Sequence, residues 1–133
     1  MRAVKRQLLV NRVIQLLIAT AALSACTLNT DLSKPSTIAI VSGDSQTAPV
    51  NSALLDSLTV VVVGSFFEPI PDETVTWTIV APGGGSLNPV TSQTNQNGAA
   101  WTRYTAGATA GAVKIQAKVS SLPAVFFDAT VTP

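Results

Sequence analysis

The side chains that usually carry enzymatic chemistry are scarce in this sequence. Its 133 residues include no histidine and a single cysteine, Cys26. Histidine-based acid–base catalysis, nucleophiles activated by histidine and histidine-ligated metals are therefore excluded. One cysteine forms neither an intramolecular disulfide nor a cysteine zinc cluster. We predict no catalytic residue, no metal and no cofactor, and we expect that the chain is not an enzyme.

The remaining candidates for chemistry have simpler structural interpretations. Asp72 and Glu73 are adjacent, so on a strand their carboxylates would point to opposite faces and not form an acid–base pair. The glycines at 83–85 lack the Lys-Ser/Thr of a phosphate-binding loop and precede a strand, which predicts a turn with positive φ. Four aspartates could in principle gather around calcium at one end of a β-sandwich, although no Asp-x-Asp spacing supports it: Asp44, Asp56, Asp72 and Asp128.

Charge and hydropathy divide the chain into a leader and a body. Four of the eight basic residues lie in the first twelve positions, and an apolar run follows them. This is the layout of a secretory signal peptide, and the run is shorter than the ~20 apolar residues that a membrane-spanning helix needs. From Cys26 onward there are four basic and seven acidic residues. This acidic segment contains no cluster of basic residues that could bind the phosphates of nucleic acid, so we do not expect nucleic acid as a partner.

The apolar run ends in Leu-Ser-Ala-Cys at positions 23–26. This segment resembles the lipobox of bacterial lipoproteins. The resemblance implies removal of a signal peptide over residues 1–25, a diacylglyceryl group on the Cys26 thiol and a membrane as partner through that anchor. Thr27 stands where an aspartate would retain a Gram-negative lipoprotein in the inner membrane. We therefore expect a lipid-anchored location in the cell envelope, at the outer membrane or cell surface.

The mature chain separates into a tether and one domain. Residues 26–35 are polar and end in proline, which predicts a tether, with an edge strand as the alternative for part of it. In residues 36–133, Val, Thr and Ile dominate between turn signals, which predicts an all-β, immunoglobulin-like β-sandwich of seven to eight short strands without a disulfide. The predicted strands cover 36–42, 58–63, 74–80, 90–94, 99–105, 112–119 and 124–131. Trp77 is expected to be the central aromatic residue of the core.

Alternation along 99–105 predicts which side chains face solvent. It places Trp101 and Arg103 outward and the side chains between them inward, unless a bulge at the preceding Asn-Gly turn reverses the pattern. Phe66 and Phe67 lie in the loop after the strand at 58–63, and we expect one of them to plug the end of the sandwich. Because exposed aromatics and arginine carry much of the energy of interfaces, these four residues form the predicted contact surface if the domain binds a partner. The alternative for Trp101 and Arg103 is a cross-strand surface pair without a ligand.

Four segments occur in a characteristic order: 68–77 (EPIPDETVTW), 83–87 (GGGSL), 94–100 (TNQNGAA) and 106–117 (AGATAGAVKIQA). Together they resemble bacterial immunoglobulin-like domains of group 1, the repeat type of invasin and intimin. The resemblance implies a β-sandwich without catalysis that serves as a spacer or adhesive module on bacterial surfaces. The sequence departs from that family at 64–69, where Gly-Ser-Phe-Phe-Glu-Pro replaces the usual Asp-x-x-Gly-Asn-Pro, and it contains one copy of the repeat.

Two functional hypotheses follow. The favoured one is a lipid-anchored, non-enzymatic cell-surface module with a structural or adhesive role, which contacts a protein or glycan. The alternative is a carbohydrate-binding accessory lipoprotein of a surface polysaccharide system. A planar row of exposed aromatic residues would favour the alternative, because sugar rings stack on such rows.

Overall fold

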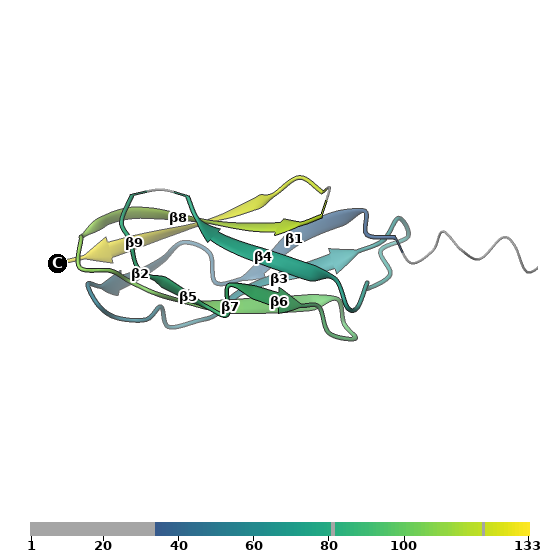
Figure 1. Cartoon of the computed structure of the whole chain (residues 1–133), viewed down its shortest axis with the longest axis horizontal. Helices are drawn as coiled ribbons and strands as arrows, with labels where there is room; N and C mark the ends of the chain where they lie inside the picture. Colours follow the sequence, from purple (N-terminus) through teal and green to yellow (C-terminus); the bar gives the residue numbers. More distant parts are fainter. Residues whose placement is uncertain (1–33, 81, 121) are drawn as a thin grey trace, which may run out of the picture. The chain divides into compact units, whose positions relative to one another are not determined.

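The computed structural model describes residues 34–80, 82–120 and 122–133 of the chain. Within these residues nine strands form two β-sheets that pack face to face, as Figure 1 shows. The expected signal peptide, the expected lipidation residue Cys26 and nearly all of the expected tether lie outside the described residues. No helix in the described part of the chain is long and apolar enough to cross a membrane.

The two sheets differ in size. The four-stranded sheet has the spatial order β1 (Thr37–Ser42), β3 (Leu58–Val63), β7 (Ala99–Thr105) and β5 (Ser86–Asn88). The five-stranded sheet has the order β2 (Gln46–Pro49), β9 (Val125–Thr132), β8 (Gly111–Val119), β4 (Thr74–Ile79) and β6 (Thr91–Gln93). Strand β2 pairs with β9 in parallel, and the other paired strands are antiparallel. The predicted all-β, immunoglobulin-like sandwich is confirmed, and each predicted strand is present to within one residue at either end.

Strands β2 and β5 are not predicted by the alternation of apolar residues, because both are too short to show it. In β2 a single residue, Ala48, is buried, and the strand ends in proline. In β5 the one inward side chain is the half-buried Leu87. Pairing with a long neighbouring strand, not a hydrophobic pattern, makes these segments part of the sheets.

The core is held by packing alone, since the chain has no disulfide partner for its one cysteine. Trp77 on β4 is 3% exposed, and its ring centroid lies 5.9 Å from that of Phe127 on β9. Its indole Nε1 donates a hydrogen bond to Ser92 Oγ on β6 at 2.8 Å. Ala117 on β8 is paired with Trp77, and its small side chain leaves room for the indole beside Phe127 on β9. Trp77 is thus the central core aromatic, as predicted, and its polar group is satisfied.

Strand β7 is held at both of its ends. At its start, Gly98 has a φ of 72°, and a Cβ there would collide with the carbonyl oxygen of Val62 on β3. Near its end, Tyr104 is completely buried and its hydroxyl donates a hydrogen bond to the carbonyl oxygen of Gly84 at 2.8 Å. A Cβ at Gly85, whose φ is 101°, would lie 2.8 Å from that hydroxyl. The predicted glycine turn is confirmed, and it closes over Tyr104.

The phenol of Tyr104 predicts a loss of stability in alkali. Burial raises the pKa of Tyr104 above 10.0, with a smaller opposing effect from the backbone of Gly107. Above pH ~10 the native state therefore binds more protons than the unfolded state, so the stability contribution is complete below that pH and is lost as the pH rises through the native pKa. When urea unfolding is measured at a series of pH values above ~10, the free energy of unfolding should fall more steeply with rising pH for wild type than for Tyr104→Phe.

At neutral pH, Tyr104→Phe should cost about 1 kcal/mol, the contribution of one hydrogen bond. Tyr104 is the one tyrosine in the sequence, so the absorbance of tyrosinate reports its titration directly. Ionisation of the native phenol at its ordinary pKa, together with equal pH slopes for the two proteins, would contradict this assignment.

Candidate contact surface

Trp101 and Arg103 lie on the outer face of the four-stranded sheet. Trp101 is 51% exposed, and Arg103 is exposed and has no ion pair with any residue that the structure describes. Their strand neighbours Ala100, Thr102 and Tyr104 are completely buried. The pairing of β7 with β3 is continuous, so no bulge interrupts the alternation. The predicted orientation of β7 is therefore confirmed.

The outer face around Trp101 is almost free of charge. Strand parity and register place twelve residues on it, namely Thr37, Ala39, Ser42, Thr59, Val61, Val63, Ser86, Asn88, Ala99, Trp101, Arg103 and Thr105, and the bulge in β1 leaves Val41 exposed beside Ser42. Arg103 is the one charged residue among them. Thr59 lies directly opposite Trp101 on β3, and Asn88 lies opposite Arg103 on β5. A flat face with a large aromatic ring, one arginine and small neighbours suits contact with another surface.

The outer face of the five-stranded sheet has a different character. Lys114 and Asp128 form an ion pair across β8 and β9, with an Nζ–Oδ1 distance of 2.8 Å, and Lys118 is exposed farther along β8. Phe126 is 46% exposed there, and Lys114 Nζ lies 5.9 Å from its ring centroid. Phe126 was missed as an exposed aromatic, although the alternation that buries Phe127 also turns its neighbour outward. The lysine covers part of its ring, as in a cross-strand surface pair.

Phe66 and Phe67 are both exposed, at 75% and 83%, so the prediction that one of them plugs the end of the sandwich is wrong. Ile70 occupies that position instead and is 4% exposed. Its backbone NH donates to the carbonyl oxygen of Val62 at 3.0 Å, which ties the loop to β3. Buried Thr94 accepts a hydrogen bond from the Glu73 backbone NH and donates one to the carbonyl oxygen of Ile70. The end of the core is thus closed by Ile70, three residues after Phe67.

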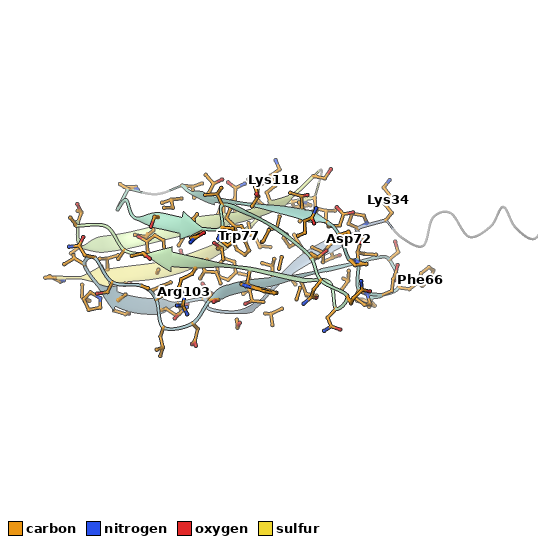
Figure 2. All side chains as sticks on the ribbon, turned by 60° about the horizontal axis from the view of Figure 1, so that its bottom comes forward. Lys34, Phe66, Asp72, Trp77, Arg103 and Lys118 are labelled. Atoms are coloured by element: carbon orange, nitrogen blue, oxygen red, sulfur yellow. The ribbon has the colours of Figure 1, made fainter. Side chains whose placement is uncertain are left out.

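The four predicted contact residues do not form one surface. Trp101 lies beside Thr59, and four more residues of β3 precede the loop that carries Phe66 and Phe67. At ~3.3 Å per residue, this places the loop at least about 13 Å away along the sheet. In Figure 2, Phe66 is at the end of the domain and Arg103 is well separated from it. The structure therefore has two candidate surfaces, the Trp101–Arg103 face and the Phe66–Phe67 turn.

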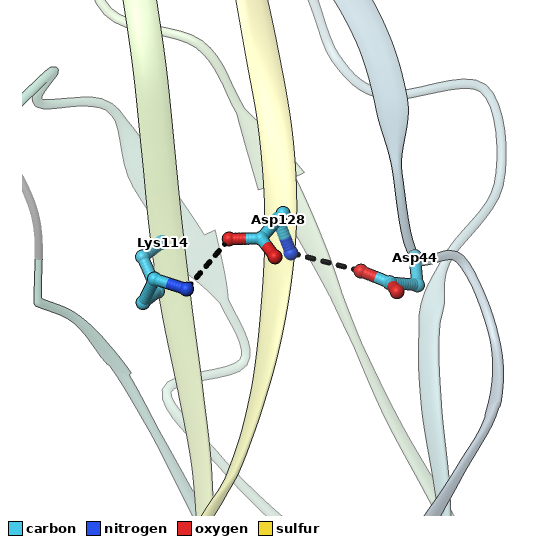
Figure 3. Close-up of polar contacts among 3 residues, drawn as sticks. All are labelled: Asp44, Lys114 and Asp128. Carbon is cyan, nitrogen blue, oxygen red and sulfur yellow. Dashed lines mark hydrogen bonds and ion pairs between the residues drawn. The ribbon is translucent and has the colours of Figure 1, made fainter.

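The four aspartates considered for calcium are not brought together. Asp44 and Asp128 are neighbours, but Asp44 Oδ1 accepts a hydrogen bond from the Asp128 backbone NH at 2.8 Å, while the Asp128 carboxylate faces Lys114 (Figure 3). Asp72 lies in the loop before β4, with a φ of 61° and an exposed side chain. Among the described residues, no three His, Cys, Asp or Glu side chains are arranged to hold a metal ion.

Comparison with known proteins places the fold among bacterial surface proteins. The chain matches a C-terminal intimin fragment, solved in complex with the intimin-binding domain of the translocated intimin receptor, at 26% identity and a TM-score of 0.57; the match covers 74% of this chain and 33% of that one. The Yersinia pseudotuberculosis adhesin InvE matches at 16% identity and a TM-score of 0.60, over 74% of this chain and 32% of that one. Domains 4 and 5 of the S-layer protein SbsC match at 16% identity and a TM-score of 0.56, over 75% and 46%.

These matches define the class of the domain. It has the bacterial immunoglobulin-like sandwich fold found in intimin and in other surface proteins. The chain spans a third to a half of the length of these structures. A comparison with protein-family models found no match, and a comparison with curated proteins found none either.

Proposed function

We propose that the chain is a lipid-anchored, non-enzymatic module of the bacterial cell surface, which binds a protein through the Trp101–Arg103 face. The observation that carries this proposal is the half-exposed Trp101 on a sheet face with one charged residue. Tryptophan and arginine are the side chains most enriched among residues that dominate binding energy. The intimin fragment, a structural neighbour at 26% identity, was solved bound to a protein receptor, which supports a protein as the ligand class.

The alternative, carbohydrate binding, receives less support from the positions of the aromatic residues. Trp101 is on the four-stranded sheet, Phe126 on the five-stranded sheet, and Phe66 and Phe67 are at the end of the domain. Within the described residues these exposed rings do not form the planar row that would stack against successive sugar units. A glycan contacting Trp101 alone remains part of the adhesive hypothesis.

The lipid anchor rests on the sequence around Cys26. Acylation at this cysteine would hold the domain at the envelope, because each buried CH₂ contributes about 0.8 kcal/mol and two or more acyl chains make a durable anchor. A location at the outer membrane or cell surface fits both this anchor and the surface proteins that share the fold.

The anchor predicts that Cys26 is acylated in the native host. Metabolic labelling with a fatty-acid analogue should give a labelled band for wild type and none for Cys26→Ser, because this is the chain's one thiol. Ser24→Thr, a conservative change two residues before the cysteine, serves as a control for altered processing. Equal labelling of wild type and Cys26→Ser would refute lipidation at this position.

The contact face predicts a partner close to Trp101. A photo-crosslinking amino acid at Thr59, directly opposite Trp101, should form a covalent adduct on intact cells. The same group at Thr76, on the outer face of the five-stranded sheet, should not. Adding Trp101→Ala should reduce the Thr59 adduct by about 30-fold or more at limiting partner, since a dominant interface residue contributes ≥ 2 kcal/mol. The substitution should change the free energy of unfolding by less than ~0.5 kcal/mol, because Trp101 packs on the surface.

An adduct that survives Trp101→Ala unchanged, or one that forms at Thr76 as readily as at Thr59, would move the contact away from this face. Absence of any adduct at Thr59 would leave the domain as a spacer.

A further inference from the structure

The Phe66–Phe67 turn lies at the end of the domain where the chain enters it. The Ser36 backbone NH donates to the carbonyl oxygen of Val63 at 2.9 Å, and Val63 is the last residue of β3 before the turn. Figure 2 shows Lys34 and Phe66 at the same end. The C-terminus of the described domain is at the opposite end (Figure 1). Any attachment on the N-terminal side therefore reaches the domain beside this turn.

The turn is built to present both phenyl rings outward. The Phe67 backbone NH donates to the carbonyl oxygen of Gly64, and Phe67 has a φ of 62°. The Glu68 carboxylate folds back and accepts a hydrogen bond from the Phe66 backbone NH at 2.9 Å. It lies so close to Gly64 that a Cβ at that position would collide with it. The charge of Glu68 is thus used inside the turn, and the two exposed rings stand beyond it.

The chain outside the described domain links this end to the proposed anchor. Cys26 precedes Lys34 by eight residues. At 3.3–3.6 Å per residue, eight residues span at most about 29 Å. A domain held on so short a tether keeps the adjacent end near the membrane surface, which makes the effective concentration of lipid at the turn high.

The charges near the turn do not favour attraction to anionic lipids. Lys34 is the basic residue beside the turn and Lys118 lies farther away, paired with Thr76, whereas Glu68, Asp72 and Glu73 are acidic. Attraction of the turn to a bilayer would therefore come from its apolar surface, as for aromatic side chains that anchor proteins at the interface of a membrane.

We propose that the Phe66–Phe67 turn inserts into the interface of the bilayer to which Cys26 anchors the chain, and so holds this end of the domain against the membrane. This inference rests on the proposed lipid anchor. It orients the molecule: the turn faces the lipid, and the opposite end, with the C-terminus, points away from it. Trp101 lies at least about 13 Å from the turn along β3, so it stays available to a partner.

A spin label beside the turn tests the insertion. The full chain carrying Ser65→Cys, purified from a host that acylates lipoproteins, is labelled with a nitroxide and reconstituted into phosphatidylcholine vesicles. Ser65 is exposed and next to Phe66, so both rings remain. The ratio of collisions with oxygen to collisions with a water-soluble nickel complex should be at least threefold higher at this label than at Thr109→Cys, in the exposed loop before β8. The ratio should not change with salt.

Matched variants separate insertion from anchoring. In Ser65→Cys with Phe66→Ser and Phe67→Ser, the ratio should fall to the Thr109 value while the protein still floats with the vesicles. Equal ratios at the two labels in a floating protein would overturn the insertion and leave the anchor intact. If the wild-type chain incorporates the fatty-acid analogue at Cys26 but does not float with the vesicles, the lipid group does not anchor it. The proposed insertion then fails together with the anchor. Protection from both oxygen and nickel, in vesicles that also contain envelope protein, would indicate a protein partner at the turn and also overturn the proposal.

Discussion

The register of β7 is the constraint on which the rest of the account depends. A shift of one residue would exchange Tyr104 with Arg103 and Thr102 with Trp101 between the core and the solvent. The turn at Gly98 prevents such a shift at one end, and the hydrogen bond from Tyr104 to Gly84 prevents it at the other. Because both restraints act on one strand, the buried tyrosine and the exposed tryptophan are two consequences of the same pairing.

The closed core explains why the functional candidates lie where they do. Trp77 packs against Phe127 at a tilted angle and its indole NH is hydrogen-bonded to Ser92, so the sandwich holds together without a disulfide. Ile70 closes the end of the sandwich and leaves the phenylalanines before it with no part in the core. Large apolar groups that have no packing role are then free to act at surfaces. One such surface is a flat sheet face, and the other is a turn beside the point of chain entry.

The sequence predicted strands and side-chain orientation well in long strands with alternating apolar residues. It predicted them poorly in short strands and loops, where one or two residues determine the conformation. Alternation in 99–105 and 112–119 predicted the strands and their inner faces, because each strand is long enough to repeat the pattern. It missed β2 and β5, which exist through pairing with a neighbour. The prediction placed one of the two phenylalanines in the core, because two adjacent aromatic residues in a loop show no periodicity. In the structure a tight turn, closed by the hydrogen bond from the Phe67 NH to the Gly64 carbonyl oxygen, exposes both side chains. Periodicity does not predict that backbone conformation. The separation of this turn from Trp101 follows from cross-strand register, which a single sequence does not contain.

Quenching of tryptophan fluorescence by iodide tests the central claim, that β4 buries its tryptophan and β7 exposes its own. The chain has two tryptophans, so Trp101→Phe reports Trp77 alone and Trp77→Phe reports Trp101 alone. We predict that emission from the Trp101→Phe protein is protected from iodide in the native state, and that emission from the folded Trp77→Phe protein is readily quenched. A quenchable Trp77 would mean that β4 does not turn its tryptophan into the core. A Trp101 that iodide does not reach would mean that β7 is paired in a different register, which would remove the Trp101–Arg103 face.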